Sequence, residues 1–321
     1  MAIYFLNMKT FGRAGGSSAA SAAAYRAGER IRDERTGRTY DHSERQDVMH
    51  KEIVLPSKFA GDDIAWARDR NSLWNAAEAA ETRQNARIAR EYLVALPVEL
   101  SPQGRVGLVR GFSQELADRY GFAIDFAIHA PRDFPGSDPR NFHAHLLTTT
   151  REVALGGLGA KTTLDMNDGN RRKLGLGPAI NELLHVRERW AAVTNEALQQ
   201  ARIAARVDHR SLEAQGIDRE PRPQIPRAAF EMERHGYRSV VADRMREDYQ
   251  ARVQARLGKV AESVMSGPAA KPQSLEEIRR EARENWLRMR QDRIQDRAQD
   301  QAESTSAAPT IHKALDDDHA L

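Results

Sequence analysis

Residues 121–153 read GFAIDFAIHAPRDFPGSDPRNFHAHLLTTTREV, and this stretch decides both the fold and the site. Residues 122–129 are rich in β-forming side chains, whereas residues 130–141 contain three prolines, a glycine and aspartates that are typical of a loop. A second β-type run follows from Phe142. The stretch therefore predicts a β-hairpin.

Three histidines lie where this hairpin would bring them together. His143 and His145 are two residues apart, so they point to the same face of a strand. His129 ends the first strand and is expected beside the start of the second. Two in-register histidines would also suit an ordinary strand, but a third at the hairpin base favours a metal site. Three imidazoles leave coordination positions open, which suits catalysis better than structure.

Length and composition limit the class of protein. The chain has 321 residues, enough for one catalytic domain and an appendage. It carries 49 Lys and Arg against 46 Asp and Glu, with a pI of about 9.2, which allows a polyanionic partner without demanding one. It has no cysteine, which excludes disulfides, thiolate metal sites and a cysteine nucleophile. No apolar run approaches the roughly 20 residues that span a bilayer, and no signal pattern is present, so we expect a cytoplasmic protein without membrane insertion.

Strand and helix patterns alternate on both sides of the hairpin. The expected strands are residues 2–8, 51–55 and 90–96, and the expected helices are residues 18–28, 62–82, 101–120 and 178–205. The glycine-rich residues 9–16 and 156–177 are expected to be loops, and residues 30–43 are charged and turn-rich. This order predicts an α+β fold with a central antiparallel sheet that helices cover on one face.

The composition also divides the chain. Residues 1–226 carry the alternating elements and are expected to form the catalytic domain. Residues 227–298 are a charged extension with few large apolar side chains, typical of solvated helices. Residues 299–321 are polar, contain Pro309 and three consecutive aspartates, and are expected to be a disordered tail.

Tyr25 is the candidate group that acts beside the metal. It follows three alanines on an expected helix, so an extended substrate can approach its hydroxyl closely. Arg26 and Arg30 would hold a phosphate next to it. Tyr25 is equally suited to a structural role, in which its ring fills the space between an alanine-rich helix and the sheet. The segment alone leaves both interpretations open.

Several ordered blocks resemble a known family. They are residues 1–4 (MAIY), 21–29 (SAAAYRAGE), 95–100 (ALPVEL), 143–152 (HAHLLTTTRE) and 207–216 (VDHRSLEAQG). Together they resemble the MobA/MobL family of plasmid mobilisation relaxases, which are similar to other endonucleases of the histidine-hydrophobic-histidine class. The resemblance covers residues 2–226 and implies a relaxase-like palm.

The resemblance implies a nicking reaction on single-stranded DNA at a plasmid origin of transfer. Carried over residue by residue, Tyr25 corresponds to the nucleophile, and His129, His143 and His145 correspond to the metal ligands. Glu91 corresponds to an acidic residue that orients a ligand histidine or assists proton removal. The product would be a 5′-phosphotyrosyl adduct with a free 3′-hydroxyl. Three imidazoles also suit zinc, nickel or cobalt, but a phosphate substrate in the cytoplasm favours Mg²⁺ or Mn²⁺.

Basic side chains in the two expected loops are candidates for contact with the DNA backbone. The first group surrounds the tyrosine and comprises Lys9, Arg13, Arg26 and Arg30. The second group is Lys161, Arg171, Arg172 and Lys173, on a segment expected to be a mobile flap that lacks the pattern of a phosphate loop.

Other functions remain open at this point. A histidine-metal hydrolase would cleave DNA with water and form no adduct, and a noncatalytic relaxosome protein would bind DNA without metal. A rolling-circle replication initiator performs the same tyrosine chemistry, although a tyrosine ahead of the histidines favours mobilisation. Accessory relaxosome proteins and a type IV secretion coupling protein are the expected protein partners.

Overall fold

The computed structural model describes residues 2–131, 138–265, 276, 279–280 and 283–288. A five-stranded sheet, entirely antiparallel, has the order β1-β5-β7-β6-β4. Its strands are β1 (Leu6–Gly12), β4 (Val48–Val54), β5 (Arg87–Ala95), β6 (Ile124–His129) and β7 (His143–Thr149). The predicted hairpin is β6 and β7, so the two central neighbours of the sheet come from the stretch that decides the fold. The α+β class is confirmed.

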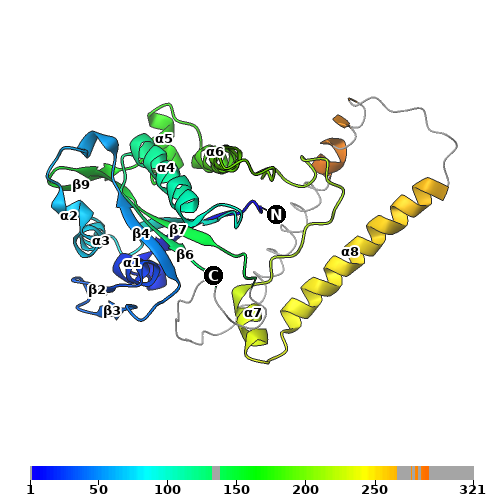
Figure 1. Cartoon of the computed structure of the whole chain (residues 1–321), viewed down its shortest axis with the longest axis horizontal. Coiled ribbons are helices and arrows are strands. Elements are labelled where there is room, and N and C mark those ends of the chain that lie inside the picture. The colour runs from blue at the N-terminus through cyan, green and yellow to red at the C-terminus, as the bar shows by residue number, and fades with distance from the viewer. Residues whose placement is uncertain (1, 132–137, 266–275, 277–278, 281–282, 289–321) are drawn as a thin grey trace. The chain divides into compact units, whose positions relative to one another are not determined.

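Helices cover both faces of this sheet (Figure 1). On one face, helices α4 (Pro102–Tyr120) and α6 (Ala179–Gln200) pack over side chains such as Phe126. On the other face, α1 (Ala19–Ala27) and α3 (Arg70–Ala79) pack over side chains such as Leu147. The prediction of helices on one face was wrong, because the central strands bury consecutive residues, as β6 does along its whole length, and so both faces of the sheet need a cover.

Helix α1 lies close against its face of the sheet because all six of its alanines are buried. The side-chain oxygen of Ser18 accepts from the backbone N–H of Ser21 and caps its first turn. Gly28 ends the helix with a φ of 58°, a conformation that favours glycine. Tyr25 in the last turn is thereby held at the sheet surface.

Several elements differ from their sequence-based expectations. The expected helix at residues 62–82 is split into α2 (Ala65–Arg68) and α3, because Asp69 is extended and caps α3. Residues 30–43 contain a small hairpin of β2 (Arg30–Arg32) and β3 (Thr39–Asp41). Strand β1 continues through the expected loop to Gly12, and a short 3-10 helix, η1 (Arg13–Gly15), follows; a second, η2 (Ser57–Phe59), follows β4.

The expected flap is also ordered into regular elements. Strands β8 (Arg151–Ala154) and β9 (Gly157–Lys161) form a two-stranded hairpin, and helix α5 (Asp168–Lys173) follows. Asn167 caps α5 by accepting from the backbone of Asn170. The glycines that suggested a loop therefore serve a tight hairpin.

The chain divides into two compact units, and the second begins at Leu212. In the second unit, α7 (Arg227–Arg234) and α8 (Val240–Met265) are helical. The domain boundary after Pro226 stays a prediction, and the predicted tail at residues 299–321 lies outside the described residues. Among the described helices, none is both long enough and apolar enough to cross a bilayer.

Candidate active site

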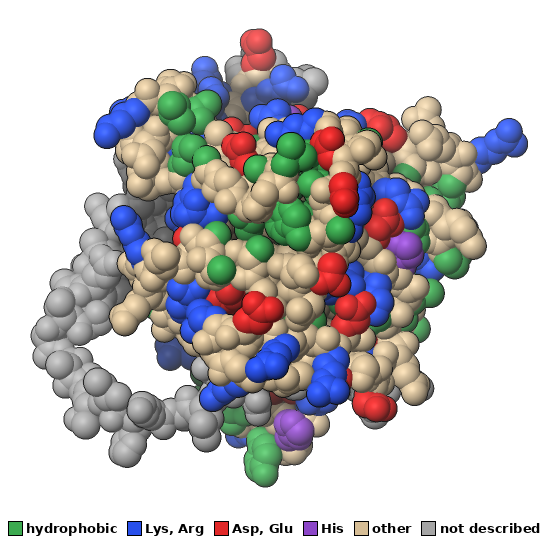
Figure 2. All heavy atoms as spheres, turned by 90° about the vertical axis from the view of Figure 1, so that its left-hand side faces the viewer, with side chains coloured by type: hydrophobic (Ala, Val, Ile, Leu, Met, Phe, Trp, Pro, Cys, Tyr) green, Lys and Arg blue, Asp and Glu red, His purple; other side chains and the backbone are tan. Residues whose placement is uncertain are grey.

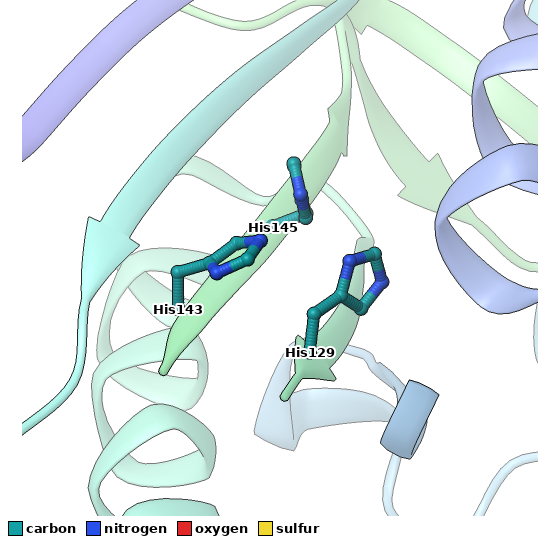
Figure 3. Close-up of side chains that lie close together, drawn as sticks. All are labelled: His129, His143 and His145. Atoms are coloured by element: carbon teal, nitrogen blue, oxygen red, sulfur yellow. The ribbon is translucent and has the colours of Figure 1, made fainter. Parts of the chain in front are cut away.

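Three histidines converge at one end of β6 and β7 (Figure 3). His129 and His143 are direct register partners, and His145 pairs with Ala127, so all three lie on the sheet face that α1 covers. Their ring centroids are 4.7 to 5.4 Å apart. One nitrogen from each ring lies within 4.8 Å of the others, close enough for a shared metal ion.

Each imidazole is oriented by an oxygen acceptor. His129 Nε2 lies 2.7 Å from the carbonyl oxygen of Arg26, and His143 Nδ1 lies 3.0 Å from that of Asn141. His145 Nδ1 lies 2.6 Å from a carboxylate oxygen of Glu91. These oxygens only accept, so they assign the proton of each neutral ring to that nitrogen and leave the other nitrogen with its lone pair. Metal-binding histidines have this arrangement.

The donor set fits a divalent cation. His145 Nε2 is buried and has no hydrogen-bond partner among the described residues, which is costly unless a ligand completes it. Burial lowers the pKa of His145 to about 4, although the hydrogen bond and charge of Glu91 raise it. Burial and the neighbouring His145 lower the pKa of His129 as well. Both rings are therefore neutral at physiological pH, the form that binds metal.

Glu91 connects the histidines to two cations. Its carboxylate accepts from His145 and from the Arg26 side chain, and Lys9 Nζ lies 3.2 Å from its second oxygen. Burial alone would raise the pKa of Glu91, but Arg26 and the hydrogen bond from His145 hold that pKa well below its usual range. The Glu91 carboxylate is therefore stabilised in its ionised form, and it fixes the orientation of His145.

Tyr25 lies beside this cluster. The guanidinium carbon of Arg45 is 4.1 Å from the centre of the Tyr25 ring, and its Nη2 lies 3.3 Å from His129 Nδ1. The His42 ring meets the Tyr25 ring edge-on at 5.3 Å. Arg26, the next residue along α1, holds His129 through its carbonyl. One arginine side chain and one backbone group thus connect the tyrosine to the histidine cluster.

Three other tyrosines of the first unit are held in structural contacts. Tyr4 donates to the carbonyl of Arg187 at 3.0 Å, and burial raises its pKa to about 12. Tyr120 donates to Glu182 at 2.8 Å, and burial again raises the pKa to about 12. Tyr92 is completely buried in the core. Tyr25 is the tyrosine that the described contacts connect to the histidines.

The family follows from comparison with known sequences. The model of the MobA/MobL family matches residues 17–235, which include Tyr25, Glu91 and all three histidines. This chain belongs to the MobA/MobL family. The family resemblance seen in the sequence is confirmed.

Named relatives agree with this assignment. The mobilization protein MobL of Acidithiobacillus ferridurans is 35% identical over 278 residues, covering 81% of this chain and 70% of that protein. The probable mobilization protein MobA of Bifidobacterium longum is 34% identical over 267 residues, covering 74% of this chain and 45% of that protein. The chain thus spans less than half of the second relative.

One solved structure is also similar. It is described as "Molecular Basis of Vancomycin Resistance Transfer in Staphylococcus aureus", and its chain is 29% identical. The TM-score is 0.52, and the match covers 65% of this chain and 100% of that one. The fold of about two thirds of this chain is therefore similar to that of a known structure.

The four basic residues expected near the tyrosine of this MobA/MobL protein differ from one another in burial. Arg26 is buried against Glu91, and Arg13 donates to Glu78 and to nearby carbonyls. Lys9 lies on β1 and is half exposed, and Arg30 is exposed, 3.8 Å from Asp41. Only Lys9 and Arg30 of this group present a largely accessible charge.

The second basic group is also divided. Arg171 is fully buried, and its guanidinium donates to the carbonyls of Thr163 and Gly177. Lys161 lies 2.8 Å from Glu81, whereas Arg172 and Lys173 are exposed on α5. Acidic side chains are interspersed among lysines and arginines on the face in Figure 2, in agreement with the nearly balanced charge.

Sequence reasoning missed Arg45 and Asp47. Both lie just after residues 30–43, a charged stretch in which nothing indicates where any side chain points. Gly28 is the residue in the sequence that relates to this contact, because a Cβ at residue 28 would lie 3.4 Å from the Cβ of Arg45. The end of α1 and the segment around Arg45 therefore lie too close together to leave free space for a side chain at residue 28.

Proposed function

We propose that this chain nicks and rejoins one strand of plasmid DNA at an origin of transfer, with Tyr25 as nucleophile and with His129, His143 and His145 holding a divalent cation. Membership of the MobA/MobL family supports this activity, as do the names of its relatives. The observation that carries the assignment is the connection of Tyr25 to His129 through Arg45 and the Arg26 carbonyl.

The chemistry is a transesterification. The Tyr25 oxygen forms a bond to phosphorus, and the bond from phosphorus to the 3′ oxygen breaks. The phenolic proton leaves to solvent or a base, and the 3′ oxygen gains a proton, so the products are a 5′-phosphotyrosyl adduct and a 3′-hydroxyl. A divalent cation on neutral imidazoles would supply electrostatic stabilisation of a nonbridging oxygen. The new ester conserves the phosphodiester linkage, so attack by a 3′-hydroxyl rejoins the strand.

The protein's own residues position these groups. Glu91 and the Arg26 and Asn141 carbonyls fix the three rings, and Arg45 lies against the face of the phenol ring. A protonated phenol is a weak nucleophile, so a cation close to the ring favours the developing phenolate. Glu91, paired with two cations, is suited to orient His145 rather than to take the proton.

Mg²⁺ or Mn²⁺ is the proposed ion, because both suit a phosphate substrate and are available in the cytoplasm, where plasmid DNA is found. The exposed basic residues Lys9, Arg30, Arg172 and Lys173 are the proposed contacts to the DNA backbone, with Lys161 at the end of β9. Accessory relaxosome proteins and a type IV secretion coupling protein are the proposed protein partners.

The test is covalent attachment. Single-stranded oligonucleotides tiled across the origin region are incubated with Mn²⁺ or Mg²⁺, and a denaturing gel is read for a protein-DNA adduct. We expect the adduct with the native protein and its loss in Tyr25→Phe. Tyr237→Phe, an exposed tyrosine of the second unit, is the matched control and keeps the adduct. Cleavage without an adduct would instead indicate a hydrolase, and binding without cleavage a noncatalytic protein.

A further inference from the structure

Arg45 occupies the space between the tyrosine and the histidines. Its Nη1 donates to the Tyr25 carbonyl at 2.8 Å, and its Nη2 lies 3.3 Å from His129 Nδ1. Asp47 anchors the guanidinium through hydrogen bonds of 2.8 Å to Nε and 2.5 Å to Nη2. The Arg45 side chain is only 12% exposed, so it is held in place rather than free in solvent.

This arrangement puts Arg45 on the nitrogen that a metal needs. The Arg26 carbonyl accepts from His129 Nε2, so the lone pair of the neutral ring is on Nδ1. A guanidinium can only donate, and Arg45 donates to that lone pair. A metal ion bound to His129 in this orientation must therefore displace the Arg45 N–H, and it also meets the repulsion of a fixed positive charge.

The Arg45 guanidinium, once displaced from His129, would stay close to the tyrosine. Nη2 carries two N–H groups, one directed to Asp47 and the other to His129. When the second is released, the bonds to Asp47 and to the Tyr25 carbonyl still hold the guanidinium beside the phenol ring. The released N–H then faces the region between the histidines and Tyr25. A phosphate oxygen is the acceptor that an arginine fork binds best.

We infer that Arg45 couples metal binding to DNA binding: it competes with the cation for His129, and once displaced it donates to the scissile phosphodiester. This inference rests on the proposed function. Arg45 lowers the affinity for metal in the absence of DNA and contributes to the rate when DNA is present. A residue that merely stabilised the site would contribute in the same direction to both.

The experiment measures these two effects separately. Mn²⁺ binding to the full chain without DNA is measured by isothermal titration calorimetry and by the loss of the free Mn²⁺ electron paramagnetic resonance signal. Arg45→Gln should bind Mn²⁺ about tenfold more tightly, as expected when a unit charge close to a divalent ion is removed. At saturating Mn²⁺, the same variant should form the covalent DNA adduct about a hundredfold more slowly.

Two further variants control the comparison. Arg189→Gln makes the same change of charge on α6, where Arg189 pairs with Glu115 and Glu196, and should match the native protein in both measurements. Arg45→Lys keeps the charge but loses the fork, so its Mn²⁺ affinity should stay within about threefold of native while adduct formation slows.

A folded Arg45→Gln protein, judged by circular dichroism, that binds Mn²⁺ no more tightly than native would overturn the competition. If that variant does not fold, Arg45→Lys decides: an adduct rate equal to native overturns the phosphate contact, and a slowed rate supports it. Failure of the proposed function has a different signature, because the native protein then forms no adduct at any Mn²⁺ concentration while the Mn²⁺ affinities still report on the competition.

Discussion

The carbonyl oxygen of Arg26 lies 2.7 Å from Nε2 of His129. Arg26 directly follows Tyr25, so the backbone at the end of α1 holds a ring of the histidine cluster and carries the tyrosine at the same time. The position of the tyrosine relative to the metal site therefore depends on how α1 ends. Gly28 ends the helix, so a change at this residue affects both the tyrosine and the histidine.

Gly28→Ala should impair the site more than the fold. Its φ of 58° is unfavourable for alanine by about 1–2 kcal/mol, and the new Cβ would lie 3.1 Å from Val48 and 3.4 Å from the Arg45 Cβ. We expect lower stability in urea unfolding and a large loss of adduct formation. Gly37→Ala is the matched control, because Gly37 has a φ of 70° but no atom within 4 Å of the added Cβ. It should lose stability but keep the adduct rate; equal rates in both variants would contradict the prediction.

Local patterns were sufficient to predict the histidine cluster, and packing was needed for the rest. Strand alternation and the pairing of two consecutive strands determine that His129, His143 and His145 meet, because hairpin pairing is a relation between neighbours in sequence. The contacts of Arg45 depend on how the residues after β3 pack against α1. Sequence periodicity does not predict this packing. The second helical layer was missed for the same reason.

Stability without metal should fall as the solution is acidified. Burial lowers the pKa of His145 to about 4 and also lowers that of His129, while the unfolded chain titrates near 6.5. The unfolded state therefore takes up protons first, so stability is complete above about pH 6.5 and is lost as the pH falls towards 4. Urea unfolding in the presence of a chelator measures this loss.

The variant that isolates this effect is His145→Gln, which cannot be protonated. It should be less stable than native at neutral pH but should show a shallower loss between pH 6.5 and 4, by roughly 1–3 kcal/mol. His185→Gln changes an exposed histidine on α6 and should leave the dependence of stability on pH unaltered. If the unfolding free energy of His145→Gln fell with pH as steeply as that of the native protein, the His145 ring would not be the cause of the loss of stability in acid.

Metal stabilisation should depend on His143. This ring is only partly buried, so His143→Ala should cost little stability in the presence of a chelator. Mn²⁺ at about 100 times its dissociation constant should stabilise the native protein by about 2.7 kcal/mol, and this gain should disappear in the variant. His185→Ala should retain the gain. Thermal melts with and without Mn²⁺ provide the comparison, and a preserved gain in His143→Ala would exclude His143 as a ligand.

The two exposed cations of α5 should contribute to DNA affinity through phosphates, whereas their buried neighbour should contribute to stability. Replacing Arg172 and Lys173 with glutamine should weaken binding of single-stranded DNA and reduce the slope of log affinity against log salt by about 1.4, since each phosphate contact contributes roughly 0.7. Lys58→Gln with Arg68→Gln makes an equal change of charge on the first unit and should leave the slope unchanged. Fluorescence anisotropy of a labelled oligonucleotide over a series of salt concentrations measures this slope.

Arg171→Gln is the contrasting change on the same helix. The Arg171 guanidinium is buried and satisfies the carbonyls of Thr163 and Gly177, so its loss leaves buried acceptors without a donor. We expect a loss of stability of about 2–4 kcal/mol and an unchanged salt slope for the protein that remains folded. A reduced slope with full stability would mean that Arg171 leaves its buried position to bind DNA, and the division of this basic group into one structural and two DNA-binding residues would then be wrong.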